Sequence, residues 1–450
     1  MSAARTLAGY LASFDASRAA PSARHAVRRA VLDTVAVAAA AAGEPVAAAI
    51  VGLVRGRAGA GAAQVWSAPW RVDEEGAALA NGTLAHALDY DDVATPMRGH
   101  PSACLVPALM ALGQPRGRTL EQLAVSYVAG FEVACTLGRA VMPAQYPRGW
   151  HTTATIGMLG AAAACAHLLG LDAGRTAHAL GIAVSHASGT LENFGTMCKP
   201  LHAGHAAAAA VRCALLAEAG FTASPTALDG RQGYLALYGG PPTLNGALAR
   251  LGREPPAILE TGIEIKKYPM CYAAHRALDG VLALRAEHGL ALEDVARAEI
   301  AGSPRSFIPL VCPRPRAGLD ARFSMPYAIA AALRDGAIRL GSFTDAAVLR
   351  PEIQDFMERV DVREAEGPDT PRWTGVALVL RDGRRLERRV ERLRGGLGQP
   401  LADAELVEKA RDCFEYGGAP AAADPVCRLA LGPGDPRIAE LAGLLRGPPG

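Results

Sequence analysis

A single short stretch, HALDYDDVATPMRGHP, places three aspartates between two histidines. The residues concerned are His86, Asp89, Asp91, Asp92 and His100. Carboxylates beside imidazoles can bind a metal ion, act as general acid and base, or cap a helix. A metal site is the weakest of these interpretations. No H-x-x-x-H pair or set of cysteine ligands supports it, and adjacent aspartate side chains often diverge.

A second polar stretch, YPRGWHTTATIG, comes directly before an apolar helical pattern and carries Arg148 and His151. Thr152 or Thr153 would be a natural N-cap for that helix. His151 would then lie near the positive end of the helix dipole. This position favours a neutral imidazole and a bound anion.

Two further polar stretches occur later in the otherwise alanine-rich chain. GTMCKPLHAGH carries Lys199 and His202 at the start of another helical pattern, where a cation could hold a carboxylate. The last stretch, IEIKKYPMCYAAHRALDG, contains Lys266, Lys267, His275 and Arg276. Each stretch also has a purely structural explanation as a helix cap, a solvated strand end or an acidic turn. Residue types alone therefore leave a shared active site open.

The elements that must position these residues change type along the chain. Residues 1–265 show helix after helix, with apolar residues three to four apart and small residues that let helix axes approach closely. From 266 to 397 the pattern becomes mixed. ARAEIAG is strand-like, and TGVALVLRDGRRLERRV alternates around an Asp-Gly turn typical of a hairpin. Residues 398–450 look helical again and are expected to pack back on the first segment.

Composition excludes several classes of protein. Lys and Arg number 46 against 44 Asp and Glu, a net charge of +2, so no one-signed field favours nucleic acid or a membrane surface. The basic stretch RDGRRLERRVERLR is interleaved with Glu387 and Glu391, which indicates a solvated strand face. TATIGMLGAAAACAHLLGL is the segment nearest to a membrane span, but its Ala, Gly and His content favours a buried helix. Nine scattered cysteines and the lack of a signal-peptide pattern favour reduced thiols and a cytoplasmic location.

The order of these stretches resembles the MmgE/PrpD family. The resemblance is carried by NGTLAHALDYDD, HPSACLVPAL, GWHTTATIGMLGAAAACAHLLGLD, KPLHAGHAAAAAV, KKYPMCYAAHRALDG and ARFSMPYAIAAALRDG, and it covers residues 5 to 440 approximately. It implies a mainly α fold, with a large all-helical domain formed by the N-terminal part and the C-terminal end, and a smaller inserted α/β domain. It also implies a homodimer without metal or organic cofactor, and a pocket between the domains for a small polycarboxylate.

The resemblance also assigns roles to residues by motif. The implied catalytic residues are Asp89, His100, His151, Lys199 and His275. Lys266 is implied to bind substrate, and Val93 stands at a position that touches it; Arg148, His202 and Arg276 are further substrate-binding candidates by residue type and place in the polar stretches. On chemical grounds we expect Asp89 to orient or charge a neighbouring histidine, and Asp91 and Asp92 to shape the loop and cap the segment after it. Val93 stands where the family commonly has threonine, a departure that touches substrate contact.

The resemblance implies a cofactor-independent lyase, a dehydratase or a decarboxylase, that breaks a bond next to a carboxylate of a small di- or tricarboxylic acid. Histidine can serve such a reaction as acid or base, and lysine can stabilise the negative charge that develops. An epimerase that uses the same α-proton abstraction is the alternative. A non-catalytic binding protein is a third hypothesis, against which the full set of site residues argues.

Overall fold

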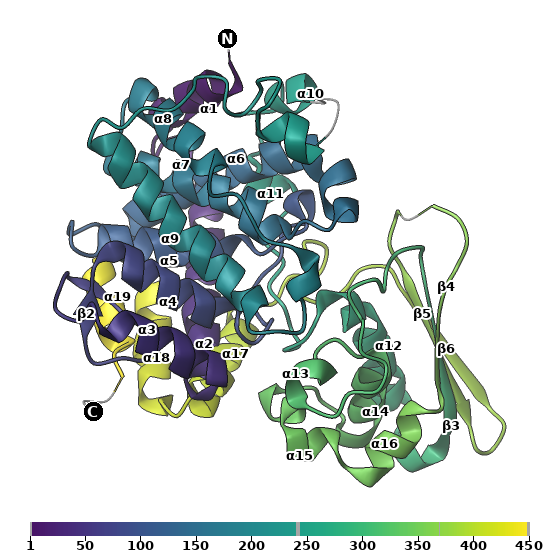
Figure 1. Cartoon of the computed structure of the whole chain (residues 1–450). Helices are drawn as coiled ribbons and strands as arrows, with labels where there is room; N and C mark the ends of the chain where they lie inside the picture. Colours follow the sequence, from purple (N-terminus) through teal and green to yellow (C-terminus); the bar gives the residue numbers. More distant parts are fainter. Residues whose placement is uncertain (1, 240–243, 369, 448–450) are drawn as a thin grey trace. The chain divides into compact units, whose positions relative to one another are not determined.

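The computed structural model describes residues 2–239, 244–368 and 370–447 (Figure 1). The chain forms two compact units, one of Met1–Ile265 together with Asp403–Gly450 and one of Lys266–Ala402. The fold is mainly helical with a small mixed sheet, as the sequence predicted. The second unit ends at Ala402 rather than at residue 397.

The first unit is built from helices and one short ribbon of two strands that the sequence did not predict. The helices are α1 (Ala3–Ala12), α2 (Pro21–Ala40), α3 (Pro45–Arg55), α4 (Glu74–His86), α5 (Pro101–Gly113), α6 (Leu120–Gln145), α7 (Met158–Leu169), α8 (Ala173–Val184), α9 (Cys198–Glu218), α10 (Leu244–Leu248), α11 (Ala257–Glu260), α17 (Asp403–Tyr416), α18 (Pro420–Leu431) and α19 (Ile438–Leu444). The ribbon pairs β1 (Ala63–Gln64) with β2 (Arg71–Val72) in antiparallel register.

Local sequence signals set the starts of several of these helices. Asp73 accepts the backbone N–H of Gly76 at the start of α4, whose first turn also carries two glutamates that favour the positive helix end. A capping box of Thr119 and Gln122 opens α6. Asp172 caps α8 in the same way as Asp73 caps α4.

Small residues allow the helices that carry the site to approach closely. A Cβ on Gly204 of α9 would lie 2.1 Å from the Thr83 hydroxyl and 2.3 Å from the Leu79 carbonyl of α4. A Cβ on Gly130 of α6 would lie 2.5 Å from the carbonyl of Gly160 in α7. The expectation that small residues bring helix axes together is therefore confirmed at these two crossings.

The second unit pairs a small sheet with helices, which lie together on one side of it (Figure 1). The elements are α12 (His275–His288), β3 (Val295–Gly302), α13 (Gly318–Ala321), α14 (Met325–Asp335), α15 (Asp345–Val348), α16 (Pro351–Met357), β4 (Val360–Glu364), β5 (Thr374–Leu380) and β6 (Arg385–Val390). The strand order is β4-β3-β5-β6, with β3 parallel to β4 and antiparallel to β5. The predicted hairpin is confirmed, since β5 pairs with β6 in antiparallel register and Gly383 has φ +90° in the turn.

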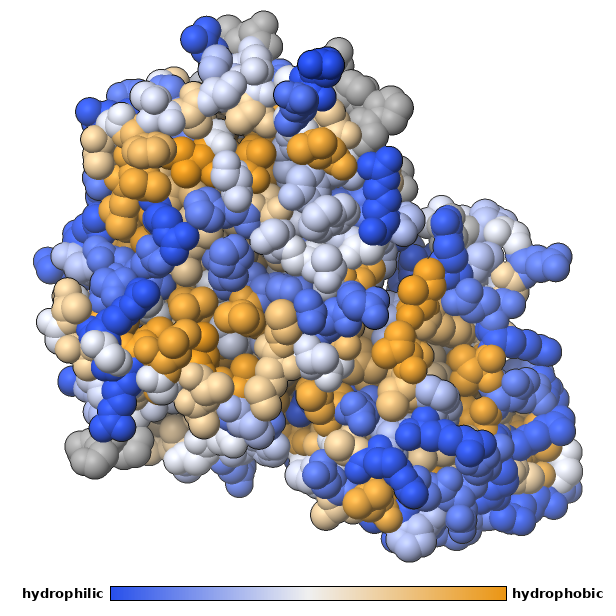
Figure 2. Space-filling model, in the orientation of Figure 1, coloured by the Kyte–Doolittle hydropathy of each residue, from blue (hydrophilic) through white to orange (hydrophobic). Residues whose placement is uncertain are grey.

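The basic strand β6 is a solvated face, as expected. Its arginines pair with glutamates: Arg385 with Glu299 and Glu387, and Arg389 with Glu391. These pairs neutralise much of the positive charge along the strand. On the face shown in Figure 2, hydrophilic residues are spread over each unit, and hydrophobic residues form several patches among them.

One described helix segment, Leu120–Met142 of α6, is long and apolar enough to cross a membrane, but 94% of that window is buried inside the protein. The sequence stretch TATIGMLGAAAACAHLLGL, named above as nearest to a membrane span, forms a shorter apolar helix, Thr153–Leu169. All nine cysteines are free, as the sequence predicted.

Candidate active site

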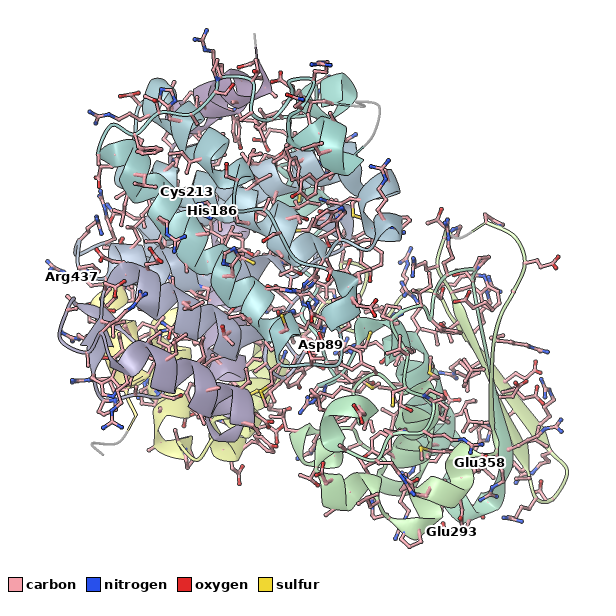
Figure 3. The ribbon with its side chains drawn as sticks, in the orientation of Figure 1. Asp89, His186, Cys213, Glu293, Glu358 and Arg437 are labelled. Carbon is pink, nitrogen blue, oxygen red and sulfur yellow. The ribbon has the colours of Figure 1, made fainter. Side chains whose placement is uncertain are left out.

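The turn that follows α4 carries the first site carboxylate. Asp89 adopts a left-handed conformation with φ +52°, which is unusual for a residue with a side chain. Its Oδ1 lies 2.6 Å from Nζ of Lys199, which belongs to the first turn of α9. Both side chains are buried, so a charged pair sits within the first unit (Figure 3 labels Asp89).

Asp91 bridges two imidazoles. Its Oδ2 lies 2.8 Å from Nδ1 of His86 and 3.1 Å from Nδ1 of His100. Burial acts to raise the pKa of Asp91, but the His100 and His86 rings outweigh it and hold that pKa well below its usual value. The expectation that Asp91 only shapes the loop was wrong, because the turn brings its carboxylate inward between the rings.

Asp89 lies at ion-pair distance from His100, as expected, but it is not the carboxylate nearest to that ring. The nearest atoms of Asp89 and His100, Oδ1 and Nε2, are 3.8 Å apart, whereas Asp91 contacts the other nitrogen of the His100 ring. Asp91 is therefore the carboxylate closer to His100. Asp89 holds the lysine ammonium.

Two more histidines continue the arrangement. The Nδ1 atoms of His151 and His202 are 3.0 Å apart, and the His151 ring stacks on that of His86 at 5.7 Å between centroids. Burial lowers the pKa of His86 and of His202 to about 4, with neighbouring histidines and Lys199 adding to the effect. Burial also holds the pKa of His151 well below its usual value. The expected neutral His151 is thus supported, although burial is its chief cause rather than a helix dipole.

The threonines after His151 do not cap a helix as expected. Thr152 donates to the carbonyl of Arg98, and the Thr153 hydroxyl accepts the backbone N–H of His100. The chain here forms a π-helical turn, Thr153–Gly157, that leads into α7. These two hydroxyl groups therefore anchor the loop that presents His100.

Asp92 caps the following helix, as expected. It accepts the backbone N–H of Ser102 in the first turn of α5, and the Ser102 hydroxyl bonds both Asp92 and the Tyr127 hydroxyl. Burial, with Asp33 and Asp91 nearby, raises the pKa of Asp92 to about 8 against the opposing effect of Ser102. At neutral pH this carboxyl is mostly protonated, unlike its neighbour Asp91.

Two of the substrate-binding candidates contact other residues of the first unit. Arg148 is exposed, and its guanidinium lies 3.5 Å from the carbonyl of Leu237. Val93 pairs through its backbone with Glu264 and is half-buried.

Three of the candidate site residues, one expected to be catalytic and two to bind substrate, belong to the second unit. Lys266 is fully buried at the unit's first position. His275 begins α12, where its Nε2 lies 3.2 Å from the carbonyl of Met270 and its ring packs on Tyr268. Arg276 donates to the carbonyl of Glu391.

Four residues offer ligand atoms that lie within 4.8 Å of one another: His86, Asp89, Asp91 and His100. The adjacent aspartates Asp91 and Asp92 do diverge as expected, but Asp89 and Asp91 converge. Two imidazoles and two carboxylates suit a divalent cation by ligand type. The ammonium of Lys199 on Asp89 competes with such an ion, because it already supplies the positive charge at that carboxylate.

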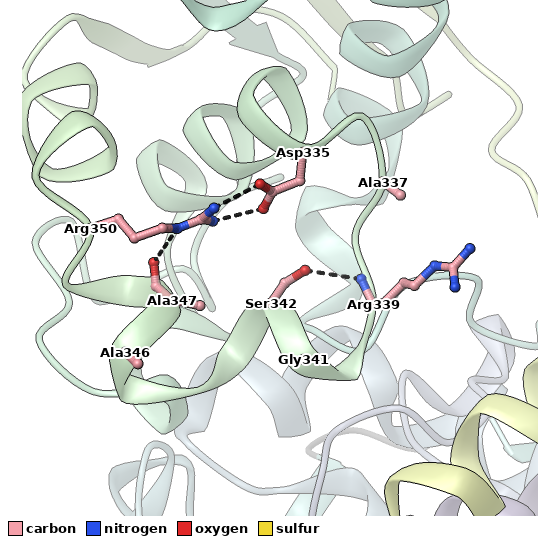
Figure 4. Close-up of a pocket in the computed structure, with 8 residues that line it drawn as sticks. All are labelled: Asp335, Ala337, Arg339, Gly341, Ser342, Ala346, Ala347 and Arg350. Atoms are coloured by element: carbon pink, nitrogen blue, oxygen red, sulfur yellow. Dashed lines mark hydrogen bonds and ion pairs between the residues drawn. The ribbon is translucent and has the colours of Figure 1, made fainter.

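A surface depression in the second unit contains none of the candidate site residues. It lies between the end of α14 and α15 and is lined by Asp335, Ala337, Arg339, Gly341, Ser342, Ala346, Ala347 and Arg350 (Figure 4). Arg350 makes two bonds to the Asp335 carboxylate, so its charge is matched within the depression.

Sequence reasoning missed three contributors to the site. His86 was weighed only as a metal ligand, Asp91 only as a metal ligand or a turn residue, and Lys409 of α17 was not singled out. Lys409 donates to the carbonyl of Tyr90 and pairs with Asp33. The spacing of apolar residues could have indicated that Lys409 is buried, since it falls three residues after Leu406 and four before Cys413 on the buried face of α17.

Comparison with known proteins identifies the family of the chain. Residues 5–247 match the model of the MmgE/PrpD N-terminal domain, and residues 268–427 match that of the C-terminal domain. The chain is 29% identical to human cis-aconitate decarboxylase over 362 residues, which is 77% of this chain and 74% of the relative. It is 26% identical to cis-aconitate decarboxylase of Aspergillus terreus over 371 residues, 74% of this chain and 73% of the relative.

Both domain models together cover most of the chain, and the relatives support an enzyme of the lyase type, in particular a decarboxylase. The chain belongs to the MmgE/PrpD family.

Proposed function

We propose that this protein is a decarboxylase that acts on a small unsaturated tricarboxylate of the cis-aconitate type through its own acidic and basic side chains. The observation that carries the proposal is the buried Asp89–Lys199 pair, flanked by an imidazole that Asp91 contacts. The similarity to cis-aconitate decarboxylases supplies the reaction class.

Loss of CO₂ breaks the carbon–carbon bond to one carboxylate and sends the electron pair into the neighbouring unsaturated carboxylate. The resulting dienolate then takes a proton at carbon. An ammonium group in a buried site stabilises this charge far better than water does, which fits Lys199.

His100 is the proposed proton donor. Its Nδ1 lies 3.1 Å from the Asp91 carboxylate, and its Nε2 lies 3.8 Å from Asp89, so the ring stands between two acidic groups. His151 is held neutral by burial, so it serves as a hydrogen-bonding group or a proton acceptor rather than as a resident acid.

We propose that the reaction needs no metal or organic cofactor, since the lysine and imidazoles supply both the charge and the proton. The test is to incubate EDTA-treated protein in D₂O with cis-aconitate, citrate, 2-methylcitrate and iminodisuccinate, and to follow each by proton NMR. Release of CO₂ with one deuterium in the product supports the proposal. Loss of water would make the enzyme a dehydratase, and deuterium exchange with inversion at constant mass would make it an epimerase. Activity restored only by added metal would contradict the metal-free mechanism.

A variant pair tests the proton donor. We expect His100→Ala to lower kcat by roughly 10²–10⁴-fold, the usual contribution of a positioned acid. His205→Ala is the matched control: this histidine lies on α9 with Lys199, but its Nε2 faces the carbonyl of His186. Equal activity in both variants would remove His100 from the mechanism.

A further inference from the structure

A charged residue of the C-terminal segment is hydrogen-bonded to the backbone of the turn that carries the site carboxylates. Lys409 of α17 is 7% exposed, and its Nζ lies 2.6 Å from Oδ1 of Asp33 in α2. The same Nζ donates to the carbonyl of Tyr90 at 2.9 Å and lies 3.8 Å from the centre of the Tyr90 ring. Tyr90 stands between Asp89 and Asp91, so one ammonium group contacts the residue that links the two functional carboxylates.

The turn needs such a constraint. Asp89 has φ +52°, a left-handed conformation that persists in residues with side chains only where the surroundings over-determine it. Lys199 holds the Asp89 carboxylate, but a contact with a side chain does not by itself fix the backbone of the turn. The bond from Lys409 to the next carbonyl along the chain supplies a fixed point on the backbone itself.

A purely stabilising role fits the Asp33–Lys409 pair poorly. Apolar residues of similar volume commonly stabilise a core as well as a buried ion pair does, because removing two charges from water is costly. An ion pair differs from apolar packing in that it directs a donor to one acceptor.

We propose that Asp33 and Lys409 are positioning residues: Asp33 orients the Lys409 ammonium onto the Tyr90 carbonyl, and this bond fixes the left-handed turn that presents Asp89 to Lys199 and Asp91 to His100. The functional consequence rests on the proposed lyase activity. The structural consequence does not.

The test compares two charge-free double variants that each remove an ion pair between α2 and α17. Asp33→Asn with Lys409→Met removes the pair under the turn. Arg29→Met with Asp403→Asn removes the pair between Arg29 and Asp403. This pair is partly exposed, and Asp403 is the first residue of α17. Removing both partners in each case avoids leaving one buried charge alone.

We expect the Asp33/Lys409 variant to lose at least tenfold in kcat with a smaller change in KM, and the Arg29/Asp403 variant to stay within twofold of wild type. Equal kcat in the two variants, or a loss in both that follows their thermal unfolding, would overturn the proposal. If the double variant does not fold, Lys409→Arg takes its place. It keeps the charge against Asp33 but carries a larger planar group that displaces the turn, so the same kcat loss is expected.

A crystal structure of the variant provides a readout that needs no substrate. We expect residue 89 to leave its left-handed conformation and its contact with Lys199 to lengthen. A variant in which φ of Asp89 stays near +52° and the Lys199 contact stays near 2.6 Å would overturn the inference. This result would stand even if the wild-type protein turned over none of the acids, so the inference and the proposed function fail independently.

Discussion

At the scale of the residue, three aspartates within four positions have three different environments. Asp89 pairs with an ammonium group, Asp91 lies between two imidazoles, and Asp92 bonds a serine hydroxyl in a fully buried place. Opposite charges favour the ionised form, while burial favours the protonated form. The pKa of Asp91 is accordingly held low and that of Asp92 is raised to about 8.

This difference predicts that the same substitution lowers kcat strongly at Asp91 and hardly at all at Asp92. Asp91→Asn removes the carboxylate charge that contacts the His86 and His100 rings, so we expect kcat to fall roughly 10²-fold or more. Asp92→Asn replaces a largely protonated acid with a neutral amide that can bond Ser102 in the same way, so kcat should change less than about threefold. Steady-state kinetics at pH 7 separate the two, and a larger loss in Asp92→Asn would contradict the assignment.

Asp92 also predicts a pH dependence of stability. Its pKa is 3.8 in an unfolded chain and about 8 when folded, so between these values the folded state binds more protons. The contribution of Asp92 to the free energy of unfolding is therefore favourable below pH 4 and is lost as the pH rises towards 8. We expect Asp92→Asn to gain stability relative to wild type across this range, by about a few kcal/mol at pH 8. Urea unfolding at pH 5 and pH 8 measures the difference, and a constant difference would contradict the raised pKa.

At the scale of the element, the crossing of α4 and α9 brings the site together. Asp89 follows the end of α4 and Lys199 begins α9, 110 residues further along the chain. Gly204 lets the two backbones approach where a side chain would collide with Thr83 and Leu79. The Asp89–Lys199 distance is therefore set by a helix crossing as well as by the two side chains.

Substituting a methyl group at this crossing tests the idea. Gly204→Ala should lower the free energy of unfolding by about 1–3 kcal/mol, since backbone rather than a flexible side chain must move. Gly52→Ala in α3 is the control, because its Cβ would meet nothing within 4 Å and alanine favours helix by about 0.5–1 kcal/mol. Denaturant unfolding compares both with wild type. A stable Gly204→Ala protein with unchanged kcat would argue against the tight crossing.

At the scale of the whole molecule, the family's two domain models and the two compact units do not share a boundary. The C-terminal domain model extends to residue 427, whereas α17 and part of α18 within it belong to the first unit. The chain therefore leaves the first unit at Ile265 and returns at Asp403 with Lys409, which reaches the turn at Tyr90 across 319 residues of sequence.

We propose that the protein works in the cytoplasm as a homodimer. Large apolar side chains such as Leu53, Phe221 and Leu237 are 57–68% exposed, and association would remove such groups from water. Light scattering after size exclusion should give about twice the 46.6 kDa of one chain at micromolar concentration. A mass of one chain at every concentration would contradict the proposal.

The sequence by itself determined the helical character of the first unit and the hairpin of the second. The spacing of apolar residues predicts the helices, the Asp-Gly pair predicts the β5–β6 hairpin, and the interleaved glutamates predict the solvated face of β6. These features depend on neighbours within a few residues, and local periodicity records them. The motifs likewise pointed to Asp89, His100, His151 and Lys199, and the structure places these four in one unit.

Only the tertiary structure decided what each side chain contacts. Asp91 lies closer to His100 than Asp89 does, Thr153 anchors the loop instead of capping a helix, and Lys409 donates to the backbone of the turn. These three contacts depend on which helices cross and at what distance. Such contacts join residues tens to hundreds of positions apart, and no local pattern of residue types specifies them. The sequence named the chemical groups of the site, and packing assigned each group its partner and thereby its charge.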